Sequence, residues 1–357
     1  MQASLTNRDH FLAVGVMSGT SLDGLDLAAV EIRYMEGNWL FKLLNTSNIP
    51  YIEKWEESLK KAPFLSGEEL TRLHFKYGKY IAKQVRKFID SNRLVPDLIA
   101  SHGHTVFHQP DEGFTLQIGS GEVIAKSTGI RTIADFRTGD VALGGQGAPL
   151  VPVGDRLLFS EYDFCLNLGG FANISFKNNG NQIAFDICPV NIILNTLAKK
   201  FGLKFDKDGE LGRQGKVNYN LLEQLDSLAF YSQKHPKSLG REWVEKHVLP
   251  ILQNSAVSDA DQLRTFYEHI AIHIAASVSG KGKMLVTGGG AFNVFLLERI
   301  KAHCSVKIIL PEPELIEFKE ALVFAFLGVL RWLGIDNCLA SVTGASRNNS
   351  SGVVYLP

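Results

Sequence analysis

GVMSGTSLDGLD, residues 15–26, lies between two apolar segments and decides the fold class of this 357-residue chain. The apolar run 11–17 predicts a buried strand, and residues 25–33, rich in Ala, Val and Ile, predict a second one. The Ser, Gly, Thr and Asp residues between them favour a tight turn. The sequence therefore predicts a strand–turn–strand hairpin near the N-terminus.

The same pattern returns later in the chain. Residues 163–168 predict a strand, 169–173 a glycine-rich turn and 174–177 another strand. Further strand or helix patterns lie at 68–92, 98–101, 190–201, 260–279, 284–287 and 317–333. Alternating strands and helices predict an α/β fold, and the two hairpins indicate two similar halves. We expect two domains, 1–135 and 136–357, with a boundary that the sequence marks only softly and a C-terminal segment free to pack on the first domain.

Composition excludes several classes of protein. Lys plus Arg and Asp plus Glu number 37 each, so the basic excess of a nucleic-acid-binding protein is missing. Residues 1–10 lack the apolar core of a signal peptide, and the longest apolar run, 321–330, falls short of the roughly 20 residues that cross a bilayer. The four cysteines form no CxxC pair, which favours reduced, mostly buried thiols. We expect a cytoplasmic protein with neither a membrane nor a nucleic-acid partner.

The turn of the first hairpin is a candidate phosphate site. It lacks the lysine of a Walker loop and is followed by a predicted strand, so it is not a P-loop. Gly19, Thr20 and Ser21 offer backbone N–H groups and hydroxyls to phosphate oxygens. Asp23 and Asp26 add carboxylates that suit Mg²⁺ bound through water. The alternative is an ordinary hairpin turn.

Two further glycine turns follow predicted strands. Gly169-Gly170 lets the backbone approach a ligand closely, although a β-bulge or tight turn also explains it. Gly288-Gly289-Gly290 lies between a predicted strand and a predicted helix, where phosphates can bind, although a flexible connection is the alternative. Three such turns together favour a nucleotide cleft more strongly than any one of them.

Polar residues near these turns are candidates for chemistry. Asp186 ends an apolar strand just before Pro189, so it can act as a base or cap the next helix. The histidines of 101–108 can bind a metal or sugar hydroxyls, or lie in a plain loop. Arg137 and Asp140 occupy a glycine-rich segment that predicts a ligand-positioning loop, with a surface salt-bridge loop as the alternative.

Six segments, in this order, resemble the anhydro-N-acetylmuramic acid kinase family: 17–26, 101–108, 115–119, 135–152, 167–175 and 287–293. The family belongs to the superfamily of acetate and sugar kinases, heat-shock ATPases and actin. The resemblance implies two RNase H-like domains with ATP in the cleft between them. It also implies that 1,6-anhydro-N-acetylmuramate, ATP and water give N-acetylmuramate 6-phosphate and ADP in cell-wall recycling. A small-molecule sugar substrate, Mg²⁺ and a homodimer are expected with it.

The resemblance also implies roles for individual residues. The ATP-binding residues would be Gly19, Thr20, Ser21, Leu22, Asp23, Gly24, Leu25, Asp26, Gly169, Gly170, Gly288, Gly289 and Gly290. Asp186 matches the catalytic base, and Glu320 resembles the glutamate that the C-terminal helix brings to the site. The sugar-binding segments would supply Ser101, His102, Gly103, Arg137 and Asp140. Asp23 would hold Mg²⁺ through water.

The chain departs from the family pattern at several positions. The family commonly shows Asp-Thr-Gly-Pro-Gly-Asn around the base, whereas Ile187, Cys188 and Val190 stand here. His104 stands where Gln is frequent, and Asp155 lies near the place of a usual His. An actin-like ATPase without a sugar substrate and a catalytically silent sugar or nucleotide sensor are the alternative functions. ATP turnover with and without the anhydro sugar separates them.

Overall fold

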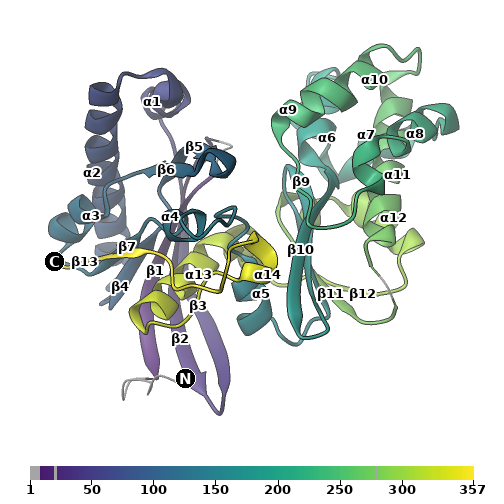
Figure 1. Cartoon of the computed structure of the whole chain (residues 1–357). Helices are drawn as coiled ribbons and strands as arrows, with labels where there is room; N and C mark the ends of the chain where they lie inside the picture. The colour runs from purple at the N-terminus through teal and green to yellow at the C-terminus, as the bar shows by residue number, and fades with distance from the viewer. Residues whose placement is uncertain (1–8, 20–21, 279) are drawn as a thin grey trace. The chain divides into compact units, whose positions relative to one another are not determined.

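The structure of the chain is a computed structural model that describes residues 9–19, 22–278 and 280–357. It consists of two compact units (Figure 1). The first unit runs to Leu158 and includes Phe318–Pro357, and the second is Phe159–Glu317. The division thus lies later in the chain than the expected boundary after residue 135, and the C-terminal segment belongs to the first unit.

A buried carboxylate ties residues beyond 135 to the first unit. Asp140 is fully buried, and its Oδ1 accepts hydrogen bonds from Thr343 Oγ1 and Asn349 Nδ2, both at 2.9 Å. A second tie is the buried ion pair of 2.7 Å between Lys319 Nζ and Asp155 Oδ1. Both interactions join the segment after residue 135 to the C-terminal segment, and the composition of the chain does not reveal them.

The first unit is built on a six-stranded sheet with the order β13-β7-β4-β1-β2-β3. Its strands are β1 His10–Ser18, β2 Gly24–Met35, β3 Asn38–Pro50, β4 Leu98–Ser101, β7 Thr132–Ala134 and β13 Val353–Tyr355. Strands β1, β2 and β3 form an antiparallel meander, whereas β4 pairs parallel to β1 and β7 parallel to β4. The last strand, β13, adds antiparallel at the edge.

The second unit repeats this plan in a five-stranded sheet with the order β10-β9-β8-β11-β12. Its strands are β8 Phe164–Leu168, β9 Phe171–Asn178, β10 Asn181–Pro189, β11 Lys283–Thr287 and β12 Lys307–Ile309. Again the first three strands form an antiparallel meander, and the next two add in parallel beside the first. This order, third-second-first-fourth-fifth, is the RNase H-like topology. The predicted α/β class and the two similar halves are confirmed.

Helices and small elements complete each unit. The first has α1 Glu53–Lys61, η1 Ala62–Phe64, α2 Gly67–Asn92, the hairpin of β5 His104–Gln109 and β6 Phe114–Ile118 with η2 Pro110–Glu112, α3 Gly121–Thr128, α4 Thr138–Val141, α5 Pro152–Leu158 and α14 Ala340–Thr343. The second has α6 Asn191–Lys199, η3 Lys207–Gly209, α7 Glu210–Gln214, α8 Tyr219–Asp226, η4 Ala229–Ser232, α9 Arg241–Trp243, η5 Val244–Val248, α10 Leu249–Gln253, α11 Asp259–Ala276, η6 Gly289–Phe292 and α12 Val294–His303. Helix α13, Pro313–Trp332, contains the division between the units. Among the described residues, no helix combines the length and the apolar character that a membrane span needs.

The first sheet is covered by a helix on each face. Val14 and Val16 of β1 share a core with Tyr77 and other apolar residues of α2. Gly15 alternates with them and faces α13, because side chains along a strand point to opposite faces in turn. A Cβ added at Gly15 would lie 1.8 Å from the carbonyl oxygen of Ala321. Only glycine therefore lets α13 approach β1 this closely.

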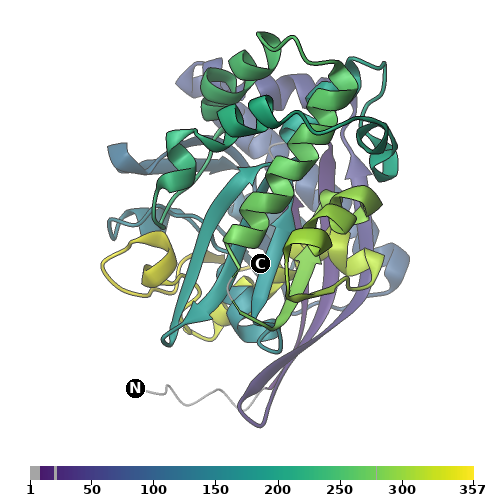
Figure 2. The ribbon, with the colours of Figure 1, turned by 90° about the vertical axis from the view of Figure 1, so that its right-hand side faces the viewer.

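The core of the second unit lies between its sheet and α11. Phe266, Ile270 and Ile274 of α11 are fully buried in one cluster with Leu166 and Leu168 of β8. Figure 2 shows the green helices of this unit in front of its teal strands. The long helix predicted at 260–279 is confirmed, and it fixes the positions of side chains along its buried face.

Candidate active site

The carboxyl ends of three parallel strands gather the predicted site residues of the first unit. Ser101 of β4 pairs with Val16 of β1 on one side and with Ala134 of β7 on the other. Because these strands run parallel, the loops that follow them leave from the same edge of the sheet. Gly19, the stretch 101–103 and Arg137 therefore all lie at this edge.

The first glycine turn is described only in part. Thr20 and Ser21 lie outside the described residues. Leu22 has a positive φ of 60°, a conformation that favours glycine and marks a sharply turned backbone. Leu25 is fully buried in the core, so its side chain supports the turn from within.

The strand after the turn is closely packed. A Cβ at Gly24 would lie 2.5 Å from the carbonyl oxygen of Ile49, so this position requires the absence of a side chain. Asp26 accepts a hydrogen bond of 2.7 Å from Asn48 on the neighbouring strand. As predicted, a strand and not a helix follows the turn, which distinguishes it from a P-loop.

The Glu320 carboxylate interacts with the carboxylates of Asp26 and Asp23 and with the Arg137 guanidinium in the first unit. Glu320 of α13 keeps solvent exposure, although protein atoms surround it on several sides. This partial desolvation raises the pKa of the Glu320 carboxyl, Arg137 lowers it, and Asp26 and Asp23 raise it. The cluster therefore contains a carboxyl that can hold a proton more readily than an ordinary glutamate.

Arg137 and His102 form a directed pair. The Nε of Arg137 donates to Nε2 of His102 at 3.0 Å, which assigns the imidazole proton to Nδ1, where it donates to the Gly103 carbonyl at 3.0 Å. Burial and the arginine charge keep the pKa of His102 well below its usual value, so the ring is neutral. Burial lowers the pKa of Arg137 to about 10, which leaves it charged at neutral pH, and its Nη1 donates to the Gly147 carbonyl at 2.6 Å.

Two other predicted sugar residues differ in their availability. The Ser101 hydroxyl is buried and has no hydrogen-bond partner among the described residues, so a ligand group would satisfy it. Asp140, in contrast, accepts hydrogen bonds from Thr343, Asn349 and the Gly147 amide. Its carboxylate supports the loop that also carries the Gly147 carbonyl, the acceptor of Arg137.

A hydrogen-bonded chain that sequence patterns did not indicate supports the end of β1. The Ser18 hydroxyl lies 2.8 Å from the Tyr51 hydroxyl and 3.1 Å from His104 Nδ1, and Tyr51 continues to Tyr77 at 2.5 Å. All four side chains are buried. Burial lowers the pKa of His104 to about 4, so this ring is neutral. These hydrogen bonds anchor Ser18, the residue directly before Gly19, to α2 and to the β5–β6 hairpin.

The histidines of 101–108 have separate partners. His102 pairs with Arg137, His104 with Ser18, and His108 Nδ1 lies 3.1 Å from Thr115 Oγ1. They do not form one of the candidate metal-binding groups among the described residues. The structure therefore favours positioning roles over the metal alternative for this stretch.

A row of polar residues crosses four strands of the second sheet. Asp186 of β10 pairs with Asn173 of β9, which pairs with Asn167 of β8, which in turn pairs with Thr287 of β11. Directly opposed residues present their side chains on the same face of a sheet. The Thr287 hydroxyl is buried and lacks a hydrogen-bond partner within the described part of the chain. The row therefore forms a polar track that ends at the predicted base.

Both glycine turns of this unit adjoin the row. A Cβ at Gly288, whose φ is +81°, would lie 2.5 Å from Asn167 Oδ1, and one at Gly290 would lie 2.7 Å from the Leu168 Cβ. Gly170 has open space at its Cβ position. Two of these glycines thus permit close packing of strand ends, whereas Gly170 leaves room beside the turn.

The third turn differs from the prediction in one respect. The three glycines were expected to open a helix, but η6 comes first and α12 begins only at Val294. Asn293 caps α12 by accepting a hydrogen bond from the Leu296 amide at 2.9 Å. The amides that a helix start would offer to a phosphate are therefore not those of the glycines.

Asp186 has the environment of a base. It lies at a β-bulge of β10, and its Oδ2 accepts a hydrogen bond of 2.8 Å from the Leu239 amide. Burial raises the pKa of Asp186 to about 6, against the opposing effect of the Leu239 hydrogen bond. The N-cap of α6 is Val190, so Asp186 does not cap that helix. A carboxylate with this pKa is ionised at neutral pH and is a stronger base than an ordinary aspartate.

Comparison with known sequences decides the family. A sequence profile of anhydro-N-acetylmuramic acid kinase matches residues 11–357. The chain belongs to the anhydro-N-acetylmuramic acid kinase family. The family member of Caldanaerobacter subterraneus subsp. tengcongensis is 34% identical, over 98% of this chain and 98% of that protein. The one of Vibrio cholerae is 36% identical, over 97% of this chain and 98% of that protein. Family membership makes the chain a kinase.

Solved structures resemble the chain more distantly. The activator of 2-hydroxyisocaproyl-CoA dehydratase from Clostridium difficile is 13% identical with a TM-score of 0.41, over 88% of this chain and 94% of that one. The xylulose kinase of Lactobacillus acidophilus is 12% identical with a TM-score of 0.44, over 97% of this chain and 94% of that one. The family assignment rests on the sequence relatives.

The departures around the base of this family member lie in the core. Ile187 is 2% exposed, and Cys188 and Val190 are fully buried. All three belong to the apolar cluster beneath the sheet. Their greater bulk is therefore accommodated by core packing and not by the surface that holds Asp186. Asp155, near the place of a usual family His, is engaged in its ion pair with Lys319.

Proposed function

We propose that the protein opens 1,6-anhydro-N-acetylmuramic acid with water and phosphorylates O6 with ATP, giving N-acetylmuramic acid 6-phosphate and ADP in peptidoglycan recycling. The family match over residues 11–357 supports the reaction class. The observation that carries the mechanism is Asp186, a carboxylate with a pKa of about 6 at the end of a polar row beside two glycine turns.

Asp186 is proposed as the general base. O6 of the substrate is bonded to C1, so it cannot accept a phosphoryl group until this bond breaks. A water that loses its proton to Asp186 would attack C1, forming the new C1 hydroxyl while the C1–O6 bond breaks. The released O6 then bonds to the γ-phosphorus as ADP leaves. An alkoxide-like O6 needs no separate proton acceptor, so one base serves the sequence.

Arg137, His102 and Ser101 are proposed to bind the sugar. Arg137 is charged and held by its bonds to His102 and the Gly147 carbonyl, which fixes the direction of its remaining donors. The unpaired Ser101 hydroxyl suits a sugar hydroxyl or amide. Asp140 is assigned a positioning role through the loop that holds Arg137, because its own oxygens are bonded within the chain.

The nucleotide roles are proposed for the glycine turns. The loop from Gly19 to Asp26 would hold phosphates through backbone amides, and Gly169-Gly170 with 288–290 would receive the nucleotide in the second unit. Glu320, with its raised pKa, is the second candidate for holding a proton during the reaction. The carboxylates of Asp23, Asp26 and Glu320 offer the oxygen donors that Mg²⁺ prefers, so the residues fit this ion, with Asp23 binding through water. When bound, Mg²⁺ supplies positive charge to the phosphate oxygens.

Oxygen tracing tests this function. In ¹⁸O-labelled water, the proposed reaction places the label at the C1 hydroxyl and none in the transferred phosphoryl group. Mass spectrometry must detect the label before opening of the sugar ring exchanges it with solvent. An ATPase would place the label in inorganic phosphate. Asp186→Asn should lose on the order of 10²–10⁴ in rate while still binding ATP. Label found only in phosphate, or full activity of Asp186→Asn, would overturn the proposal.

Two further properties are proposed from the family resemblance. We propose a cytoplasmic location and a homodimer. Light scattering on the purified full-length chain measures the second property directly, and a mass equal to the 39.4 kDa of one chain would contradict it.

A further inference from the structure

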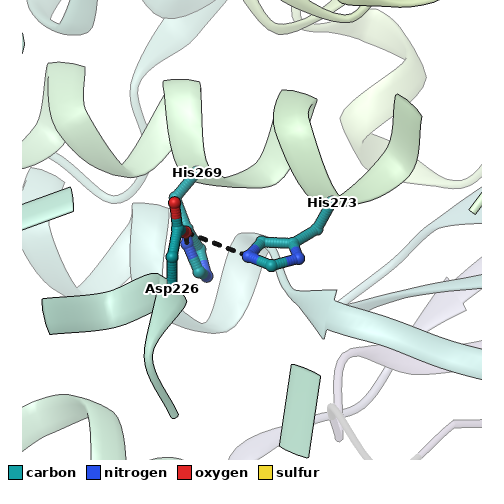
Figure 3. Close-up of side chains that lie close together, drawn as sticks. All are labelled: Asp226, His269 and His273. Carbon is teal, nitrogen blue, oxygen red and sulfur yellow. Dashed lines mark hydrogen bonds and ion pairs between the residues drawn. The ribbon is translucent and has the colours of Figure 1, made fainter. Parts of the chain in front are cut away.

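A compact group of metal-ligand side chains lies in the second unit, apart from the glycine turns. It consists of Asp226, the last residue of α8, and His269 and His273 of α11 (Figure 3). One ligand atom from each of the three lies within 4.8 Å of the other two. His269 Nδ1 is 2.5 Å and His273 Nε2 is 3.0 Å from Asp226 Oδ1. Among the described residues it is the one group of this kind that the structure contains.

The fold places these ligands firmly. The two histidines are four residues apart on a helix, so both imidazoles project from the same side one turn apart, as Figure 3 shows. Leu225, the neighbour of Asp226, is fully buried in the same core cluster as Ile270 of α11. The packing of α8 on α11 therefore brings the carboxylate to the two rings without any contribution from a flexible loop.

Tyr231 orients one of the rings. Its hydroxyl lies 2.8 Å from His269 Nε2, and its ring stacks on His273 with centroids 3.9 Å apart. A histidine that binds a metal through one nitrogen usually donates the proton of the other nitrogen to an oxygen. When a metal ion takes the place of the Nδ1 proton that His269 shares with Asp226, the Tyr231 oxygen is in place to accept the Nε2 proton, and the Nδ1 lone pair is then available to the ion.

The end of the helix also favours a cation here. Asp226 is the last residue of α8, where the partial negative charge of the last carbonyls favours a nearby positive charge.

We propose that Asp226, His269 and His273 bind a divalent transition-metal ion, for which Zn²⁺ is the reference. Two imidazole nitrogens and one carboxylate oxygen are a donor set that Zn²⁺ accepts, with water completing the tetrahedron. Mg²⁺ prefers oxygen donors and is a poor fit. The site ties the end of α8 to α11, and it is independent of the reaction proposed above.

The same atoms can also form a metal-free hydrogen-bonded network, and geometry separates the two states. Bonds of about 2.0–2.2 Å at tetrahedral angles set neighbouring ligand atoms roughly 3.4 Å apart. The present separations from Asp226 Oδ1, 2.5 and 3.0 Å, are shorter. The ion must therefore replace the bridging protons and spread the ligands by about 0.4–0.9 Å. Asp226 has a side chain that is 31% exposed at a helix end, which leaves it room to turn.

A second histidine–carboxylate cluster in the same unit serves as a matched control. Glu268 binds Arg264, Arg299 and His303. The two guanidinium groups already neutralise this carboxylate and would repel a cation. His303 thus resembles the proposed ligands in type and pairing but should not bind metal.

Equilibrium dialysis of the full-length, chelator-treated protein against Zn²⁺, without nucleotide, tests the site. Elemental analysis should find one Zn²⁺ per chain, and 1 mM-scale Mg²⁺ should not displace it. Substituting Co²⁺ should give the visible absorption of a tetrahedral ion. His273→Gln and Asp226→Asn should each weaken binding by about 100-fold or more, and Tyr231→Phe by about 10-fold, as for loss of an orienting partner.

The controls decide the outcome. His303→Ala should bind Zn²⁺ as the wild type does. Circular dichroism of His273→Gln and Asp226→Asn establishes whether each variant is folded, and Co²⁺ absorption of the wild type supplies a readout that needs no variant. Wild-type protein that binds no Zn²⁺ at micromolar concentration, or a loss in His303→Ala equal to that in His273→Gln, would overturn the proposal and leave the metal-free network.

Discussion

The protonation of Asp186 should control the acidic side of the pH–rate profile. Burial raises its pKa to about 6, whereas the Leu239 amide, 2.8 Å from Oδ2, works in the opposite direction. A base must be ionised to accept a proton, so kcat/KM should rise with pH through about 6. At pH 5 about one tenth of the enzyme would have the ionised carboxylate, and at pH 7 about nine tenths. The predicted loss between pH 7 and pH 5 is therefore about tenfold.

The Leu239 amide provides a perturbation that leaves the Asp186 side chain intact. A hydrogen bond to a charged group contributes about 1.5–3 kcal/mol, which corresponds to about 1–2 pKa units. Leu239→Pro removes the N–H donor, so the ionised form loses this stabilisation and the pKa of Asp186 should rise to about 7–8. The ionised fraction at pH 7 would fall to between about one half and one tenth. We therefore expect kcat/KM at pH 7 to fall about 2- to 10-fold and to recover above pH 9.

Coupled ADP release with saturating ATP and limiting anhydro sugar measures kcat/KM from pH 4.5 to 9.5. Leu239→Ala is the control, because it shortens the side chain but keeps the amide, and its profile should match that of the wild type. A flat wild-type profile down to pH 4.5 would refute the role of Asp186. An equal displacement in Leu239→Pro and Leu239→Ala would refute the role of the amide hydrogen bond.

Three further predictions concern stability and packing. Burial raises the pKa of Glu268, but its arginine partners outweigh this and hold the pKa at about 2. The ionised carboxylate should therefore contribute about 3 kcal/mol to the free energy of unfolding above pH 4.5, and this contribution should be lost as the pH falls toward 2. Urea unfolding of Glu268→Gln and wild type should therefore converge at low pH, and a constant difference would contradict this. Asp155→Ala removes the carboxylate 2.7 Å from the buried Lys319 ammonium and should cost about 3–5 kcal/mol, whereas Asp155→Leu combined with Lys319→Met should recover most of it in the same assay. Gly288→Ala should cost at least about 1–2 kcal/mol, because φ is +81° and the added Cβ would lie 2.5 Å from Asn167 Oδ1, while Gly289→Ala, whose nearest neighbour is 3.8 Å away, should cost less; equal melting temperatures would contradict this argument.

The strands and long helices could be predicted because their patterns are local. The helix predicted at 68–92 is Gly67–Asn92, and the strand predicted at 98–101 is β4 itself. A capping box at Ser66 and Glu69 marks the start of α2, and such signals depend on residues three positions apart. The repeated hairpins indicated two similar halves, whereas the RNase H-like fold was implied only by the family resemblance.

The parts of the candidate site that depend on register could not be predicted. Thr287 joins the polar row because β11 pairs with β8, whose Asn167 is far away in sequence. Asp140 has a partner 203 residues away, and this bond is the basis for the positioning role that we propose for it. His269 and Asp226 are 43 residues apart and showed no motif spacing. In each case the deciding partner is brought near by tertiary packing and not by local sequence.

The repeated topology explains why functional residues occur where they do in each unit. In the first unit the loop after the first strand of the meander carries Gly19, and the stretch after the adjoining parallel strand carries His102. In the second unit the corresponding loops carry Gly169 and Gly288. Strand ends that are parallel neighbours must open at the same edge, so each sheet offers one edge where two loops meet.

The two edges differ in chemistry. In the first unit the loop after β4 carries a neutral imidazole that accepts a hydrogen bond from Arg137, and the proposed function assigns this pair to the sugar. In the second unit the loop after β11 contains three glycines, and Asp186, the proposed base, lies at a bulge on the third strand of the meander, where its carboxylate accepts a hydrogen bond from the Leu239 amide. Because the two sheets share their strand order, the difference between the proposed binding edge and the proposed base lies in single loops and in one bulge.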